Sequence, residues 1–259
     1  MRPPQLASVI ERRLLVNYRV APEAVAPLLP APLRPQLVRG YAVAGICLLR
    51  LGSVRPAWAP AALGLRSENA AHRIAVEWDG PDGVETGVYI PRRDSASLVN
   101  RLAGGRIFPG EHGHADFTVR ETPDTLRVAY TTRDGLTGVD VTARVADRLE
   151  GSALFDGIDE ASAFFRAGDR GWSATRSGRA LDGMRLLTDA WSVEPGRIVA
   201  ARSSYFDDPE RFPPGTATLD SVLVMRQVPV GWQALPELPL TAPAEAGYAA
   251  GPGPRKVLR

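Results

Sequence analysis

The sequence predicts a mainly β protein of the α+β class, folded as one curved antiparallel sheet or barrel with a few short helices at its edges. Several segments alternate apolar and polar side chains with a period of two, as in HRIAVEW at His72–Trp78. Turn sequences such as GPDG at 80–83 separate neighbouring segments, which is typical of hairpins. The helical stretches are too few and too short to connect parallel strands.

The expected strands cover most of the chain. Tyr41–Leu51 is nearly continuously apolar, which favours a strand buried on both faces. His72–Trp78 places Ile74, Val76 and Trp78 on one face. In chain order, strands are expected at Val9–Tyr18, Tyr41–Leu51, His72–Trp78, Val84–Ile90, Phe117–Glu121, Leu126–Thr131, Val139–Val145, Arg185–Trp191, Ile198–Tyr205 and Ser221–Gln227.

Three short helices are expected. Pro22–Leu29 has proline in its first turn, Ser95–Leu102 follows Asp94 as an N-cap, and Ile158–Ala167 stops before a glycine. We expect residues 1–235 to form a single domain. Residues 236–259 are rich in proline, alanine and glycine, and we expect them to form a flexible tail.

The composition argues against several classes of protein. The 259 residues carry a formal net charge of +2, with arginines interspersed among acidic residues, so no nucleic-acid partner is expected. The apolar run Tyr41–Leu49 is too short to span a bilayer, and Glu11 with its two neighbouring arginines argues against a signal peptide. We therefore expect a cytoplasmic protein without a membrane partner. Cys47, the single cysteine, is expected as a small buried apolar residue rather than a reactive thiol.

Six segments together resemble a known family. The chain resembles the uncharacterised YqjF-like family of the acetoacetate decarboxylase-like superfamily over residues 8–235. The resemblance implies an antiparallel β-barrel or cone with an internal ligand pocket, and it is compatible with a homo-oligomer. The segments are IERRLLVNYRVAPEAVAPLLPAPLRP at 10–35, GYAVAGICLLRL at 40–51, SENAAHRIAVEW at 67–78, GVYIPRRDSAS at 87–97, GGRIFPG at 104–110 and SSYFDDPERFPPG at 203–215.

The chain departs from true decarboxylases at their defining lysine. In those enzymes one lysine of a pair forms a Schiff base, and the resemblance places the pair on Asn100 and Arg101. An amide nitrogen is not nucleophilic, and arginine stays protonated. The only lysine is Lys256, close to the C-terminus, so imine chemistry is not expected. Arg101 keeps a positive charge at the second position of the pair.

The resemblance also suggests a carboxylate and an arginine in the pocket. Glu68 matches the decarboxylase glutamate, and Arg12 or Arg13 matches the arginine that contacts the substrate carboxylate. Glu68 could be a general acid or base, or an exposed loop residue paired with Arg66 or Arg73. We expect it to be charge-paired and to face an enclosed apolar cavity.

The remaining candidates are two arginines and three histidines. Arg92 or Arg93 could clamp an anion, or both could simply mark a helix entry. An H-x-H pair on a strand, with His72 and Glu68, contains enough ligands for a metal, but acid–base chemistry is favoured and we expect no metal and no cofactor. The candidate catalytic residues are Glu68, His72 and Asn100, and the candidate substrate-binding residues are Arg12, Arg13, Arg92, Arg101, His112 and His114.

Several functions remain open. The favoured one is a small-molecule enzyme without a Schiff base, performing lyase, dehydratase, isomerase or cyclase chemistry on an oxo or carboxylic compound. A non-catalytic protein that binds such a ligand is the first alternative, and a histidine-based metal-dependent enzyme is the second. Decarboxylation through an imine comes last.

Overall fold

The computed structural model describes residues 6–97, 110, 112–175 and 177–240. Its strands join into one 13-stranded sheet, so the predicted mainly β class is confirmed. In chain order the elements are β1 (Leu6–Val20), α1 (Pro22–Val25), a 3-10 helix (Ala26–Leu28), β2 (Arg34–Pro35), β3 (Leu37–Val38), β4 (Tyr41–Pro56), a second 3-10 helix (Ala61–Leu63), β5 (Leu65–Gly80), β6 (Gly83–Ser95), β7 (His112–Glu121), β8 (Thr125–Thr132), β9 (Gly138–Val145), α3 (Ile158–Ala167), β10 (Arg170–Ala174), β11 (Ala180–Leu187), β12 (Glu194–Ser203) and β13 (Ala217–Pro239).

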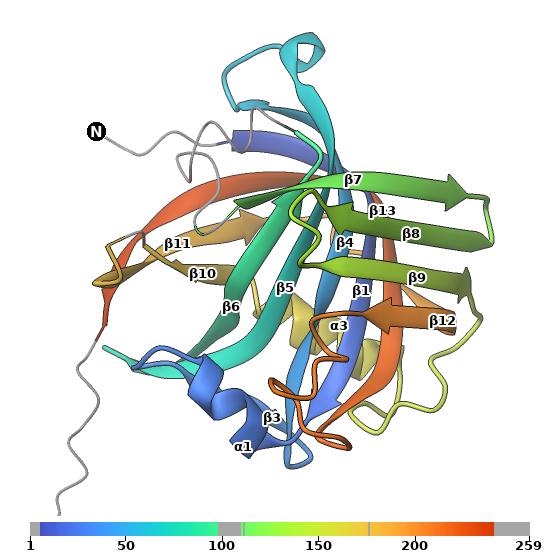
Figure 1. Cartoon of the computed structure of the whole chain (residues 1–259). Coiled ribbons are helices and arrows are strands. Elements are labelled where there is room, and N and C mark those ends of the chain that lie inside the picture. Colours follow the sequence, from blue (N-terminus) through green and yellow to red (C-terminus); the bar gives the residue numbers. More distant parts are fainter. Residues whose placement is uncertain (1–5, 98–109, 111, 176, 241–259) are drawn as a thin grey trace, which may run out of the picture.

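The sheet closes on itself twice. The first ring runs β6-β7-β8-β9-β12-β13-β1-β4-β5 and closes through the β5–β6 pairing. The second runs β6-β10-β11-β13-β1-β4-β5 and closes through the β11–β13 pairing. The two rings therefore share a wall made of β13, β1, β4, β5 and β6. Figure 1 shows β7, β8, β9 and β12 on one side of this wall and β10 and β11 on the other. Most neighbours are antiparallel, but β6 pairs in parallel with both β7 and β10.

The shared wall explains the continuous apolar runs in the sequence. Every residue from Ala42 to Leu48 on β4 is buried, because one face lies in the core of the first ring and the other is covered by α3 and the segment around Phe155. Even-numbered residues such as Ile46 and Leu48 belong to the core of the first ring, whereas Val43 and Cys47 pack on the opposite face. In the strands outside the wall only one face is buried, and β8 alternates accordingly.

Helix α3 packs on the second-ring side of the wall. It has Asp159 and Glu160 in its first turn and Arg166 in its last turn, which suits the helix dipole. Its buried residues Ala161 and Phe165 are four apart and therefore lie on one face. Both belong to the apolar cluster that contains Cys47 on β4.

Most predicted strands are longer in the structure, and three predicted boundaries were wrong in ways that bear on the site. Asp94 and Ser95 do not begin a helix, because β6 continues through Ser95; the rest of that predicted helix lies outside the described residues. The strand predicted at Arg185–Trp191 instead spans Ala180–Leu187 and ends before a turn in which the Thr188 hydroxyl accepts from the Ala190 N–H and donates to the Pro229 carbonyl. β13 continues past residue 236 to Pro239, because Leu238 pairs with Leu181 of β11.

Helix α3 has the bounds that the sequence predicts, whereas the five-residue strand β10 that follows it was not predicted. No helix in the described part of the chain is both long and apolar enough to cross a membrane.

Candidate functional site

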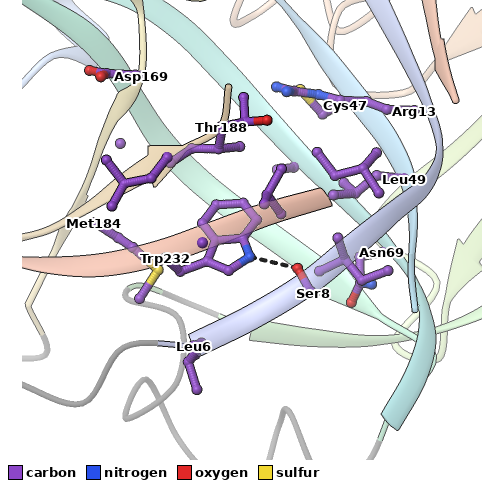
Figure 2. Close-up of a pocket in the computed structure, with 18 of the residues that line it drawn as sticks. Leu6, Ser8, Arg13, Cys47, Leu49, Asn69, Asp169, Met184, Thr188 and Trp232 are labelled. Atoms are coloured by element: carbon purple, nitrogen blue, oxygen red, sulfur yellow. Dashed lines mark hydrogen bonds between the residues drawn. The ribbon is translucent and has the colours of Figure 1, made fainter. Parts of the chain in front are cut away.

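A large cavity lies within the second ring. Its volume is about 1010 Å³, at the upper end of the range for small-molecule sites. It is lined by β1, β4, β5, β6, β10, β11, β13 and the end of α3, so every strand of that ring contributes. Apolar side chains such as Leu49, Ile90, Met184 and Trp232 make up much of its surface. Figure 2 shows the Trp232 ring in this pocket, with its indole N–H donating to the Ser8 hydroxyl at 2.8 Å.

Three of the six arginines that line this cavity lie close together in the strand register. Arg13 lies on β1, Arg73 on β5 and Arg93 on β6. Arg73 is 3% exposed, its guanidinium donates to Asn17, and its charge lies over the Phe165 ring at 4.7 Å. Among the described residues, no carboxylate forms an ion pair with Arg13 or Arg73, and the Nε of each is buried without a hydrogen-bond partner. Uncompensated buried cations are costly, so this end of the cavity is suited to an anion.

The single cysteine lies among these arginines. Cys47 is buried and lines the cavity, and its Sγ accepts a hydrogen bond from Arg13 Nη2 at 3.1 Å. Figure 2 shows the Arg13 and Cys47 side chains next to each other. The predicted burial is confirmed, but the surroundings are not purely apolar.

Burial and charge oppose each other at this cluster. Burial raises the pKa of the Cys47 thiol, but the charges of Arg13 and Arg73 and their hydrogen bonds outweigh it, so the net pKa is lowered. Burial also lowers the pKa of Arg93 to about 10 and lowers that of Arg73. The thiol is thus pushed toward its charged form, and the two buried guanidinium groups are pushed away from theirs.

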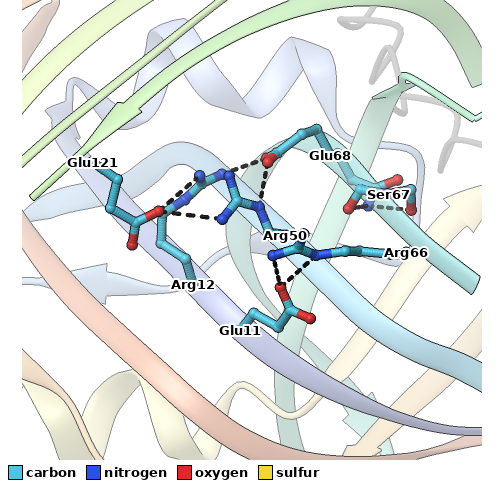
Figure 3. A network of polar contacts seen from close by, with 8 residues as sticks. Glu11, Arg12, Arg50, Arg66, Ser67, Glu68 and Glu121 are labelled. Atoms are coloured by element: carbon cyan, nitrogen blue, oxygen red, sulfur yellow. Dashed lines mark hydrogen bonds and ion pairs between the residues drawn. The ribbon is translucent and has the colours of Figure 1, made fainter.

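Glu68 lies elsewhere, in a network inside the first ring. Arg12, Arg50 and Glu68 occupy directly paired positions on β1, β4 and β5. Glu68 accepts from Arg12 and from Arg50, each at 2.5 Å, and Glu121 of β7 lies 3.7 Å from Arg12 and 3.3 Å from Arg50. Figure 3 shows this network. Glu68 is charge-paired as expected, but neither Glu68 nor Arg12 lines the large cavity, so the expectation that Glu68 faces it was wrong.

His72 is a core residue of the same ring. Its side chain is fully buried, its ring centroid lies 4.4 Å from that of Tyr205, and neither ring nitrogen has a hydrogen-bond partner in the part of the chain that the structure describes. Burial, together with the charges of Arg92 and Arg211, lowers the pKa of His72 to about 3. It is therefore neutral at neutral pH, and it does not line the large cavity.

A bulge decides which arginine of β6 faces the cavity. Between the pairs His72↔Arg92 and Ile74↔Tyr89, β6 has one residue more than β5, and that extra stretch contains Pro91. The side-chain alternation shifts there, so Ile90 and Arg93 both line the cavity. Arg92 does not line it, and its Nε donates to Asp94 at 3.0 Å.

The two histidines of the H-x-H segment lie in different surroundings. His112 lines the cavity, whereas His114 is buried and does not. Gly113 pairs with Asp94, and a Cβ at Gly113 would lie 2.1 Å from the Asp94 carboxylate. The glycine therefore makes room for this carboxylate. No group of three or more potential metal ligands occurs within the described ranges.

The predicted site residues thus fall into separate places. Arg13 and His112 meet at the cavity, while Arg12, Glu68, His72, Arg92 and His114 do not line it, and Asn100 and Arg101 lie outside the described residues. Cys47 and Arg73 line the cavity although neither was predicted as a site residue. The period of two offered the signal, because Cys47 and Arg73 are each two residues from an apolar neighbour on the same face, Leu49 and Ala71.

Solved structures show the class of fold. Over 92% of this chain and 87% of the other, the chain is similar to an acetoacetate decarboxylase from Legionella pneumophila, with a TM-score of 0.56 at 11% sequence identity. An acetoacetate decarboxylase-like enzyme from Sphingomonas wittichii gives a TM-score of 0.56 at 15% identity, covering 93% and 94% of the two chains. The enduracididine biosynthesis enzyme MppR, complexed with pyruvate, gives 0.55 at 17%, covering 93% and 91%. The fold is therefore acetoacetate decarboxylase-like.

Within that class the sequence identifies the family. The model of DUF2071, described as an uncharacterized conserved protein, matches residues 9–216. The chain belongs to this YqjF-like family, as the sequence segments predicted. No curated protein matches the chain.

Proposed function

We propose that the protein is a small-molecule enzyme that binds a carboxylate or oxo compound in the cavity of the second ring. The observation that carries the proposal is the group of Arg13, Arg73 and Arg93 in a cavity that is also lined by many apolar side chains and by Asp94, Asp169 and Asp189. A guanidinium can hold a carboxylate through two parallel hydrogen bonds, and a low-dielectric wall strengthens the attraction. The apolar lining at Ile90, Met184 and Trp232 would accept the organic part of the ligand.

The similarity to an enzyme complexed with pyruvate supports the same ligand class. The reaction we propose is lyase, dehydratase, isomerase or cyclase chemistry without a Schiff base. A protein that only binds such a ligand is the second candidate, since Asn100 stands where the resemblance implies the reactive lysine. The catalytic roles of Glu68, His72 and Asn100, the cytoplasmic location and a homo-oligomeric state stay predictions.

Carboxylate recognition can be tested by comparing acids with their uncharged esters. We expect a panel of short 2-oxo and 3-oxo acids, including pyruvate, to contain members that bind about tenfold more tightly than their methyl esters. Trp232 lines the cavity, so its fluorescence can report binding. Arg13→Gln and Arg73→Gln should remove the preference for the acid. Arg127→Gln is the control, because Arg127 pairs with Asp140 on the partly exposed β8–β9 surface. Equal affinities for acids and esters throughout the panel would contradict the proposal.

Absence of imine chemistry is a separate expectation. Incubation with a 3-oxo acid and sodium borohydride should leave the mass of the protein unchanged, because Lys256 is the only lysine. Intact-mass spectrometry provides the measurement. A stable adduct mapped to Lys256 would show that an imine forms after all.

A further inference from the structure

We infer that Cys47 is the nucleophile of this cavity and that its sulfur adds to an electrophilic carbon of the anion held by the neighbouring arginines. The inference deepens the proposed function and rests on it. The lone thiol is supported by a second, independent feature of the cavity. That feature is Arg73, which is 3% exposed, lines the cavity and has a buried Nε with no hydrogen-bond partner among the described residues.

The strand register fixes the relative positions of these side chains in the sheet. Cys47 pairs directly with Ala71 on β5, and Ala71 pairs with Arg93 on β6. Arg13 pairs with Leu49, two residues from Cys47, so Arg13 and Cys47 are diagonal neighbours on one face. Arg73 follows Ala71 by two residues and therefore lies diagonally on the other side of the thiol. The sulfur on β4 thus lies between Arg13 of β1 and Arg73 of β5, and Arg93 of β6 is two strands away.

Neighbouring positive charges of this kind activate thiols as nucleophiles. A thiolate is far more nucleophilic than a thiol, and adjacent fixed positive charges favour it. The Arg13 hydrogen bond to Sγ at 3.1 Å provides such a charge directly. A bound carboxylate would neutralise the same arginines, so the ligand and the thiolate share one cluster of cations.

The chemical step balances without an external oxidant or reductant. With an oxo acid, the sulfur electron pair forms a bond to the carbonyl carbon, and the carbonyl π pair moves to oxygen. That oxygen takes one proton from water and gives a tetrahedral hemithioketal. The carboxylate keeps its charge throughout and stays on the arginines. The nucleophile would thus be a sulfur on β4, at a site that needs no amine.

Alkylation with two nearly isosteric reagents tests the inference. Iodoacetate carries a carboxylate and iodoacetamide does not, and each forms an S–C bond to the thiolate while releasing iodide. Cys47 is the only cysteine, so mass spectrometry of the intact chain reports this residue alone. We expect iodoacetate to react about tenfold faster than iodoacetamide, propionate to slow it by competition, and Arg13→Gln to remove the preference.

The pH profile provides a second measurement. A free thiol loses reactivity about tenfold per pH unit below its pKa, whereas the Cys47 rate should fall less steeply between pH 8.0 and 6.5. Reaction with iodoacetamide that equals or exceeds that with iodoacetate, or a tenfold loss per pH unit, would overturn the inference. So would reaction that occurs only after unfolding.

Cys47→Ser separates this inference from the proposed function. If the variant binds oxo acids as before and the wild-type thiol shows no preference for iodoacetate, the nucleophile assignment falls and the anion site stands. If neither the wild type nor Cys47→Ser binds any acid of the panel better than its ester, both fall. If Cys47→Ser still binds and the wild type shows both the reagent preference and the shallow pH profile, both are supported.

Discussion

Glu68→Gln is expected to lower the free energy of unfolding by about 3 kcal/mol. The substitution leaves Arg12, which is 1% exposed, without its closest anionic partner, and it also removes one of the two carboxylates that pair with Arg50. Glu121 cannot replace that partner fully, because it lies 3.7 Å from Arg12. Denaturation by urea at neutral pH, followed by fluorescence and circular dichroism, measures the change.

Glu85→Gln is the matched control for this variant. Glu85 pairs with Arg170 at 2.6 Å, but both side chains are about one-third exposed, so the loss should stay below about 1 kcal/mol. The double variant Arg12→Met/Glu68→Gln should be more stable than Glu68→Gln, because it removes the uncompensated buried charge. If Glu68→Gln unfolds at the same urea concentration as wild type, the network does not stabilise the fold.

Acidification should destabilise the protein through His72. Above about pH 6.5 the histidine is neutral in both the folded and the unfolded states, and it contributes nothing to pH dependence. Below that pH the unfolded chain takes up a proton, but the folded chain does not until the pH approaches the folded pKa of about 3. The unfolded state therefore binds more protons, and stability falls by roughly 1.4 kcal/mol per pH unit in this window.

His72→Phe isolates this contribution. In the wild type the ring centroids of His72 and Tyr205 lie 4.4 Å apart. The substitution keeps an aromatic ring beside Tyr205 and removes the group that titrates. Urea unfolding of both proteins at pH 7.5, 6.0 and 5.0 should give curves that converge toward neutral pH and separate in acid, with the variant the less sensitive. Carboxylates titrate in both proteins, so their effect cancels in the difference. Parallel pH dependences would show that His72 does not resist protonation.

Most of the strand pattern could be predicted because it follows from burial. A run such as Ala42–Leu48 is apolar on both faces since the first-ring core covers one face and α3 with its neighbours covers the other, and β8 alternates since only one of its faces is buried. β10 was missed because RGWSA is short and begins with a charged residue and a glycine. Its place depends on parallel pairing with β6, which is distant in sequence, as well as on antiparallel pairing with the following strand β11.

The candidate site was predicted less well, for geometric reasons. Residues next to each other in sequence, such as Arg12 and Arg13, point into different rings, so a motif position alone cannot tell which one meets a ligand. The bulge at Pro91 then changes the alternation and exchanges Arg92 for Arg93 at the cavity. Neither the second ring nor the bulge is encoded in a local pattern. The likeness to decarboxylases pointed to Glu68, which the fold places on the other side of the wall.

The wall between the two rings also separates the positions where mutations have different consequences. On β4, Ile46 and Leu48 fill the first ring, while Cys47 and Leu49 face the cavity of the second. Substitutions at every other residue can therefore reshape the cavity while the packing of the first ring stays unchanged. A combinatorial library restricted to cavity-facing positions such as Leu49, Ile90 and Met184 would sample new ligand shapes at little risk to folding. Within the family, ligand specificity could diverge in the same way, through substitutions at cavity-facing positions of the wall strands while the residues that face the first ring stay the same.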